Sequence, residues 1–287
     1  MVTEADASVD WPAPAKLNLF LHITGRRADG YHTLQTVFRL LDYGDSLDFG
    51  VTADGRISRQ APIPGVVEEQ DLVVRAARLL QRETGCSRGV RIRLRKRLPL
   101  GGGLGGGSSN AATTLVALNR LWRTGLDEDA LAELGATLGA DVPVFIRGRS
   151  AWAEGVGEQL TALELPPEWY VVLVPDCGVS TAEVFAAPEL TRDTPPLKMA
   201  AFRPGVGRND CEYVVKQRYP RVARALAALA ETGEARMTGT GACVFAAFPE
   251  RCDAQRALER CRLAGWDGFV ARGLNRSPLF DRLSEEA

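Results

Sequence analysis

The stretch PLGGGLGGGSSNAAT, residues 99–113, places six glycines in seven positions ahead of two serines and an asparagine. Glycine loses more conformational freedom on folding than any other residue. Such a cluster is therefore typical of backbone that turns with positive φ or comes very close to another group. The residues on either side of the cluster indicate which group that is.

The glycines are flanked by a strand pattern and a helix pattern. The segment VRIRLRKRLPL (90–100) alternates apolar and basic residues, as an antiparallel strand with one solvated face does. In SSNAATTLVALNRLW (108–122) apolar residues recur at helical spacing, and Ser108, Ser109 and Asn110 are of types favoured at a helix N-cap. Unpaired N–H groups and the positive end of the helix dipole meet at such a helix start, so the loop predicts a phosphate site.

Three alternative roles for the glycines fit less well. A flexible linker normally continues in serine and glycine without a capped amphipathic helix directly behind it. The P-loop pattern needs a lysine after its last glycine, and none follows Gly106 or Gly107. The dinucleotide fingerprint does match at Gly101, Gly103 and Gly106. However, Asp127, the acidic residue ~20 positions on, begins another helix instead of closing a second parallel strand.

Composition limits the class of protein. A chain of 287 residues with 45% hydrophobic residues can form one large domain or two smaller ones, and we expect two. The formal net charge of −1 gives no basic field, so neither nucleic acid nor a membrane is expected as a partner. The six cysteines form no CxxC pair and the start MVTEADASVDW lacks the features of a leader, so a cytoplasmic location is expected. Only two histidines are present, which predicts no zinc site.

The remaining patterns predict a mixed α and β chain. Alternation predicts strands over 16–23 and 33–43, and apolar spacing with a closing glycine predicts a helix over 71–85. From residue 235 to 274 the order strands, helix, strand indicates a split βαβ unit. The segment 186–207 is rich in proline and turn residues and is expected to be mobile. Asn209 with Glu212 three residues later is expected to form a capping box at a helix start.

One carboxylate and one lysine are candidates for chemistry. Asp141 lies between the helical ALAELGATLGA and the strand-like VPVFI, at an element end where a side chain can face a cleft. An ordinary turn or cap aspartate explains the same position. Lys16 lies in an otherwise apolar strand beside Asn18. A lone lysine in a strand is usually solvated, but a buried ammonium group at this position would need a partner.

Three stretches, in order, resemble the motifs of the GHMP kinases, the small-molecule kinases named for galactose, homoserine, mevalonate and phosphomevalonate. They are PAPAKLNLFLHITGRRADGYHTLQT (12–36), PLGGGLGGGSSNAAT (99–113) and MTGTGACVFAAF (237–248), and further similarity in LGADVPVF, AEGVGE and NRSPLF extends over nearly the whole chain. The resemblance implies an α+β fold of two domains with the active site in the cleft between them. Residues 1–155 are expected to form a nucleotide-binding, catalytic domain of the ribosomal-protein-S5-like type. Residues 156–287 are expected to form a split βαβ, ferredoxin-like domain on the substrate side.

The resemblance also implies a direct phosphoryl transfer from ATP to an alcohol, with Asp141 as the base and Lys16 as the stabilising cation. Such a transfer needs positioning, charge neutralisation and a proton acceptor. The residues expected to bind ATP are Pro99, Leu100, Gly101, Gly102, Gly103, Leu104, Gly105, Gly106, Gly107, Ser108, Ser109 and Thr240. Mg²⁺ is expected to bridge phosphate oxygens, with Ser108 or Ser109 touching it, and no other metal ligand is assigned.

The form of the first motif, AKLNL followed by DGYH, resembles members that phosphorylate a cytidine diphosphate ester of methylerythritol. The residues expected to bind this small molecule are Asn18, Tyr31, His32, Ser180, Thr181 and Phe185. Tyr31 and His32 suit stacking on and hydrogen bonding to a pyrimidine, with Phe185 opposing Tyr31. A tyrosine packed at a hairpin end explains Tyr31 equally well.

Two alternatives to this function stay open. One is a GHMP kinase with a different acceptor, and the other is a nucleotide-binding protein without catalysis. A monomer or a weak homodimer is expected.

Overall fold

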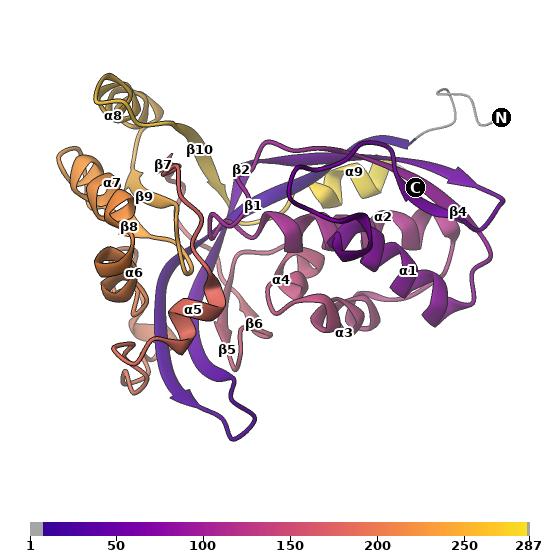
Figure 1. Cartoon of the computed structure of the whole chain (residues 1–287), viewed down its shortest axis with the longest axis horizontal. Helices are drawn as coiled ribbons and strands as arrows, with labels where there is room; N and C mark the ends of the chain where they lie inside the picture. Colours follow the sequence, from indigo (N-terminus) through magenta and orange to yellow (C-terminus); the bar gives the residue numbers. More distant parts are fainter. Residues whose placement is uncertain (1–7, 286–287) are drawn as a thin grey trace.

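Two long antiparallel strands cross the N-terminal half and end in a hairpin beside the C-terminal half (Figure 1). The computed structural model describes residues 8–285, in which β1 (Ser8–Arg26) pairs with β2 (His32–Thr52). The strands expected over 16–23 and 33–43 are confirmed, and both are longer than predicted. Residues 13–23 are all buried, so the alternation typical of a one-sided strand is lost in much of β1. Residues 1–7, and with them most of the segment expected to lack a leader, lie outside the described residues.

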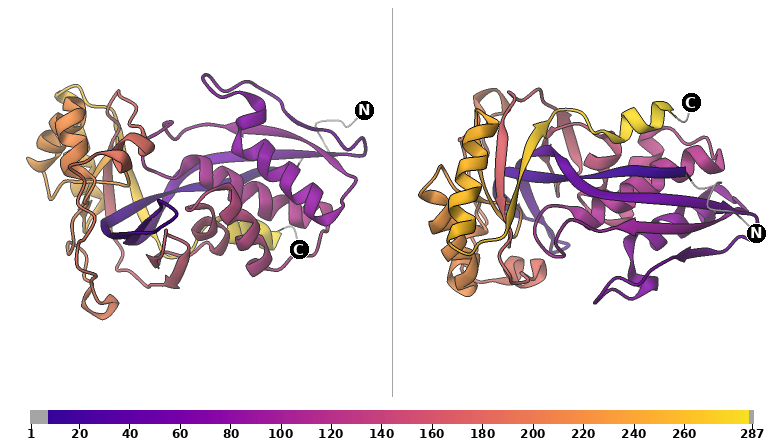
Figure 2. Two further views of the ribbon diagram at one scale, coloured as in Figure 1. Left: turned by 60° about the horizontal axis from the view of Figure 1, so that its bottom comes forward. Right: turned by 90° about the horizontal axis from the view of Figure 1, so that it is seen from above.

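The N-terminal half is a sheet with helices on one face. The strands that extend it from β2 are β4 (Gly89–Arg95), β3 (Ile57–Arg59), β5 (Ala151–Glu154) and β6 (Gln159–Ala162). The helices are α1 (Leu72–Thr84), α2 (Gly106–Trp122), α3 (Glu128–Leu138) and α4 (Val142–Arg147). Figure 2 shows them together against the long strands. The expected stripe of α2 is confirmed, since Ala111, Leu115, Leu118 and Trp122 are all buried in the core beneath the sheet.

The C-terminal half adds a second antiparallel group of strands, which joins the first through β10 and β2. Its order is β10 (Gly268–Leu274), β7 (Trp169–Leu173), β9 (Val244–Phe248) and β8 (Arg236–Met237). Its helices are α5 (Thr181–Ala186), α6 (Glu212–Arg218), α7 (Pro220–Ala230) and α8 (Arg251–Leu263). The order predicted for residues 235–274 is therefore confirmed. The last helix, α9 (Leu279–Glu285), returns to pack against β1 and α2 (Figure 1).

One element was predicted wrongly. The segment after Asp141, expected as a strand because of its valines and isoleucine, is the helix α4. Pro143 fits the first turn of that helix, where an N–H group would have no partner, and the apolar residues of α4 are buried all round. A short, fully apolar run has no periodicity from which strand and helix can be told apart.

The division at residues 155 and 156 stays a prediction, as does the mobility of residues 186–207. Within residues 8–285 no helix has both the length and the apolar character needed to cross a bilayer.

Candidate active site

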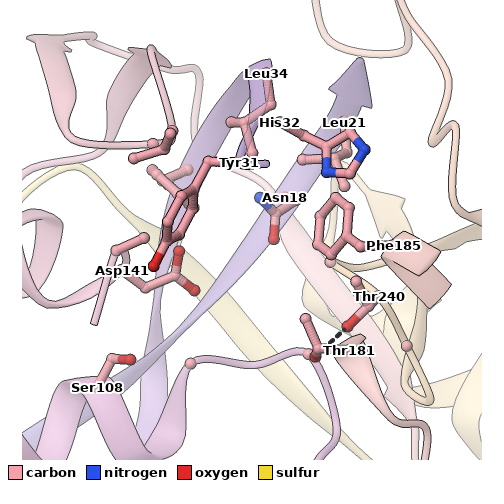
Figure 3. Close-up of a pocket in the computed structure, with 18 of the residues that line it drawn as sticks. Asn18, Leu21, Tyr31, His32, Leu34, Ser108, Asp141, Thr181, Phe185 and Thr240 are labelled. Carbon is pink, nitrogen blue, oxygen red and sulfur yellow. Dashed lines mark hydrogen bonds between the residues drawn. The ribbon is translucent and has the colours of Figure 1, made fainter. Parts of the chain in front are cut away.

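A cavity of about 760 Å³ lies where the β1–β2 hairpin, two glycine-containing loops and α5 meet (Figure 3). Many of the residues predicted from the sequence line it: Lys16, Asn18, Tyr31, His32, Gly101, Gly103, Gly105, Ser108, Asp141, Thr181, Phe185 and Thr240. The other predicted residues do not: Pro99, Leu100, Gly102, Leu104, Gly106, Gly107, Ser109 and Ser180. Segments from both halves of the chain therefore form one site of a size usual for small ligands.

The glycine loop ends in an open helix start. Gly101, Gly103 and Gly105 have φ values of 66°, 75° and 70°, in the left-handed region that favours glycine. The expected cap by Ser108, Ser109 or Asn110 is wrong, because Gly105 occupies the N-cap position and α2 begins at Gly106. No side chain caps the first turn. Its N–H groups are therefore available for an anion.

A second loop, residues 238–241, packs directly against the first. The Ala242 and Cys243 N–H groups donate to the carbonyls of Gly101 and Gly102 at 3.3 Å and 3.1 Å. A Cβ at Gly103 would lie 2.3 Å from the carbonyl oxygen of Thr238. The bare backbone at Gly103 is thus required by contact between two protein loops, in addition to any approach of a phosphate.

Lys16 and Asp141, the two residues to which the resemblance assigns the chemistry, lie side by side. Ala15 and Leu17, on either side of Lys16 in β1, are fully buried in the core, so Lys16 and Asn18 point to the opposite face. The Lys16 ammonium donates to Asn18 Oδ1 at 2.6 Å and to the Gly103 carbonyl at 2.9 Å. It also lies 3.3 Å from Asp141 Oδ2. Three acceptors therefore surround its three hydrogens.

Asp141 differs from an ordinary cap residue. It occupies the N-cap position of α4, but its side chain accepts no capping hydrogen bond. The side chain is 33% exposed whereas that of Lys16 is 3% exposed. The carboxylate is therefore held on one side by a buried cation and is open to the cavity on the other.

Aromatic residues line the other end of the cavity (Figure 3). The rings of His32 and Phe185 are stacked, with centroids 5.1 Å apart and planes 25° apart. Tyr31 follows the hairpin turn and is 66% exposed, and in Figure 3 its ring stands apart from this pair. The ring that faces Phe185 is thus His32, and the opposition of Phe185 and Tyr31 across a base stays a prediction. Burial, and then the positive charges of Arg192 and Arg26, lower the pKa of the His32 imidazole below its ordinary value.

The predicted substrate residues in 180–185 separate into two roles. Ser180 is the N-cap of α5 and accepts a hydrogen bond from the Glu183 N–H at 3.3 Å, which explains it without contact to the cavity. Thr181 lines the cavity, and its hydroxyl lies 2.9 Å from that of Thr240. This pair links α5 to the loop 238–241.

Asn209 is a site-supporting residue that the sequence pattern misassigned. The capping box expected for Asn209 and Glu212 is wrong, because α6 begins at Glu212 with Cys211 as its N-cap. The Asn209 amide instead donates to the carbonyls of Met237 and Gly239 at 2.8 Å and 2.7 Å. It holds the second loop in place from a segment about thirty residues away. No local sequence signal distinguishes that role from a cap.

The oxygen-bearing side chains at the cavity suit a metal ion that is held mainly by a bound phosphate compound. Within residues 8–285 no three histidine, cysteine or acidic side chains gather as a metal site. The cavity offers the Ser108 hydroxyl and the Asp141 carboxylate. Ser109 is fully buried and its hydroxyl has no partner within the described chain. Mg²⁺ prefers phosphate oxygens and water with few protein ligands, so this set fits that ion.

Comparison with known families gives two matches. Residues 71–149 match the model of the GHMP kinases N terminal domain, and residues 197–265 match that of the GHMP kinases C terminal region. The first covers the glycine loop and Asp141, and the second covers the loop 238–241.

The chain is also similar to individual proteins over nearly its whole length. It is 60% identical over 280 residues to the 4-diphosphocytidyl-2-C-methyl-D-erythritol kinase of Halorhodospira halophila, covering 96% of this chain and 97% of that protein. It is 60% identical over 275 residues to the kinase of the same name from Nitrosococcus oceani, covering 96% and 98%. A solved structure of 4-(cytidine 5'-diphospho)-2C-methyl-D-erythritol kinase superposes with a TM-score of 0.80 at 35% identity, covering 93% and 98%.

Proposed function

The chain belongs to the GHMP kinases, and we propose that it transfers the γ-phosphoryl group of ATP to the 2-hydroxyl of 4-diphosphocytidyl-2-C-methyl-D-erythritol, a step of non-mevalonate isoprenoid synthesis. The α+β kinase fold and the family expected from the sequence are confirmed. The substrate is supported by the near full-length identity to kinases of that name. We further propose a cytoplasmic enzyme that is a monomer or a weak homodimer.

The observation that best supports the proposed phosphoryl transfer is the Lys16–Asp141 pair at the cavity. We assign Asp141 as the group that accepts the hydroxyl proton while the substrate oxygen forms its bond to the γ-phosphorus and the bond to the β-phosphate oxygen breaks. Lys16 holds the carboxylate in place through the 3.3 Å contact. Because the ammonium is buried and fully bonded, it needs no reorganisation to stabilise charge that develops beside it.

The glycine loop and the start of α2 are proposed to bind the phosphates of ATP. Both present backbone N–H groups without a competing side-chain cap. Ser108 is the residue that would hold Mg²⁺, which when bound neutralises charge on the transferred phosphoryl group. Thr240 faces the same space from the second loop.

Acceptor specificity tests this proposal. In an assay that couples ADP release to a dye, we expect rapid turnover with the cytidine compound and at least about tenfold lower kcat/KM with its uridine analogue. A site that hydrogen-bonds a base edge strongly rejects a base that cannot make those bonds. Free methylerythritol or its monophosphate should hardly be used. A better rate with mevalonate, homoserine or a simple sugar would reject the proposed substrate, and no ADP release with any acceptor would favour the binding protein without catalysis.

A further inference from the structure

Arg192 is the residue behind the aromatic end of the cavity. Its guanidinium does not line the cavity but makes four hydrogen bonds next to it. It donates from Nη1 to the Leu190 carbonyl at 3.0 Å, and from Nη2 to the carbonyls of Phe185 and Ala187 at 3.0 Å and 2.7 Å. The fourth bond runs from Nε to Nε2 of His32 at 3.1 Å. One side chain thus joins the end of α5, which carries Phe185, to the imidazole stacked on it.

The chemistry of the guanidinium determines the state of the imidazole. Arginine has five N–H donors, has no acceptor, and keeps its proton at all ordinary pH values. The His32 nitrogen that receives its hydrogen bond must therefore present a lone pair. A neutral histidine with a lone pair on Nε2 carries its hydrogen on Nδ1. In the part of the chain that the structure describes, Nδ1 has no hydrogen-bond partner, and His32 lines the cavity.

The charges around His32 favour the same state. Arg192 and Arg26 are both positive and disfavour an imidazolium. Three carboxylates of the hairpin turn and of residues 183–189 have other partners: Asp29 pairs with Arg27, Glu183 accepts from the Tyr219 hydroxyl, and Glu189 pairs with Arg218. Within residues 8–285 no carboxylate is among the groups that shift the pKa of His32, and the hydrogen bond at its Nε2 comes from Arg192.

We propose that Arg192 is a specificity-determining positioning residue, which holds His32 as the neutral Nδ1–H tautomer against Phe185 so that the cavity presents a hydrogen-bond donor to the base of the substrate. The inference rests on the proposed function. A donor suits the N3 atom of cytosine, which is an acceptor, and opposes N3 of uracil, which carries a hydrogen. Arg192 thereby selects the base without touching it.

A purely structural role for Arg192 makes different predictions. If Arg192 only donates hydrogen bonds to the carbonyls of residues 185–190, its loss lowers the stability of the protein and leaves the preference between substrate bases unchanged. Arg203 provides the matched control, because among residues 8–285 its guanidinium donates only to the carbonyls of Ala200 and Phe202 in the same segment. Arg192→Met and Arg203→Met both remove hydrogen bonds to backbone carbonyls. Only Arg192→Met also removes the hydrogen bond that His32 Nε2 accepts.

Nitrogen NMR of the full chain with labelled histidine reads the tautomer directly. The spectrum is simple because the sequence has two histidines, and His22 serves as an internal reference. In the wild type we expect His32 to show a protonated Nδ1, an unprotonated Nε2 and a pKa below the ordinary value of about 6.5. In Arg192→Met the signals should move toward the Nε2–H form common in water. An Nε2–H tautomer in the wild type, or an unchanged tautomer in Arg192→Met, overturns the proposal.

Kinetics on the same proteins test the consequence for specificity. Arg192→Met should raise KM for the cytidine substrate and reduce the preference for cytidine over uridine by about tenfold, the effect of one unpaired buried group. KM for ATP should stay unchanged, and Arg203→Met should keep the wild-type preference.

If the wild type phosphorylates the cytidine compound and Arg192→Met keeps the full preference, this inference alone fails. If the wild type does not phosphorylate it, the proposed function fails and the specificity role falls with it. If Arg192→Met does not fold, the tautomer of His32 in the wild-type protein still tests the proposal.

Discussion

Asp141→Asn is expected to lower kcat by at least about 10²-fold while KM for ATP stays within about twofold. Asparagine keeps the size of the side chain and its ability to cap a helix, but it cannot accept the proton. It also removes the charge that faces Lys16 at 3.3 Å. Steady-state kinetics with the cytidine compound give kcat, and a thermal melt of the variant checks that it folds.

Asp127→Asn is the matched control for this variant. Asp127 is the N-cap of α3, and its carboxylate does accept the capping hydrogen bond from the Ala130 N–H. Asparagine is an equally good N-cap, so both stability and kcat should stay at wild-type values. If Asp141→Asn retained more than about a tenth of the wild-type kcat, Asp141 would not be the base.

Lys16→Met is expected to reduce kcat by about 10²-fold or more, the cost of removing one preorganised stabilising group. Methionine fits the apolar surroundings of the lysine stem but leaves Asn18 Oδ1 without its ammonium donor. The free energy of unfolding should therefore fall by about 1–3 kcal/mol, as measured by urea denaturation. The Gly103 carbonyl keeps the hydrogen bond from the Thr238 hydroxyl at 3.2 Å, so the two glycine loops should stay together.

Lys216→Met is the control for the lysine. Lys216 lies 3.9 Å from Glu212 on the surface of α6, so its loss should change neither kcat nor stability measurably. A Lys16→Met protein with the wild-type kcat would show that the buried cation only supports the fold.

Burial predicts that Lys16 needs a partner, whereas the choice of Asp141 among the 36 acidic residues follows from the resemblance to the GHMP kinases. An ammonium group in an apolar strand needs an acidic partner, and Asp141 lies at an element end. The strands and the stripe of α2 were predictable for a related reason, since periodicity directly reports which face is buried. The glycine cluster predicts backbone with positive φ, but residue type does not distinguish the left-handed glycines at 101, 103 and 105 from those at 102, 106 and 107.

The rest of the site depends on contacts between distant segments. Asn18 N–H donates to the Thr238 hydroxyl 220 residues away, and neither residue has a local pattern that indicates the other. Asn209 and Glu212 match a capping box by spacing, but the Asn209 amide is used by the second loop instead. Arg192 lies in a segment that looks like an irregular connection, so its bond to His32 is visible only in the folded chain. Tertiary contacts override local preference in each case.

The position of the new phosphate in the product distinguishes the proposed reaction from transfer to any other hydroxyl. Carbon 2 of the acceptor bears the methyl group and no hydrogen, so phosphorylation there has a distinct NMR signature. With the cytidine compound and Mg²⁺-ATP, we predict a new phosphomonoester signal without splitting by a carbinol proton, together with phosphorus splitting of the carbon-13 signals of carbon 2 and its methyl group. A phosphorus signal split by a carbinol proton would place the phosphate on another hydroxyl, and that result, or an ATP spectrum that does not change, would contradict the proposed reaction.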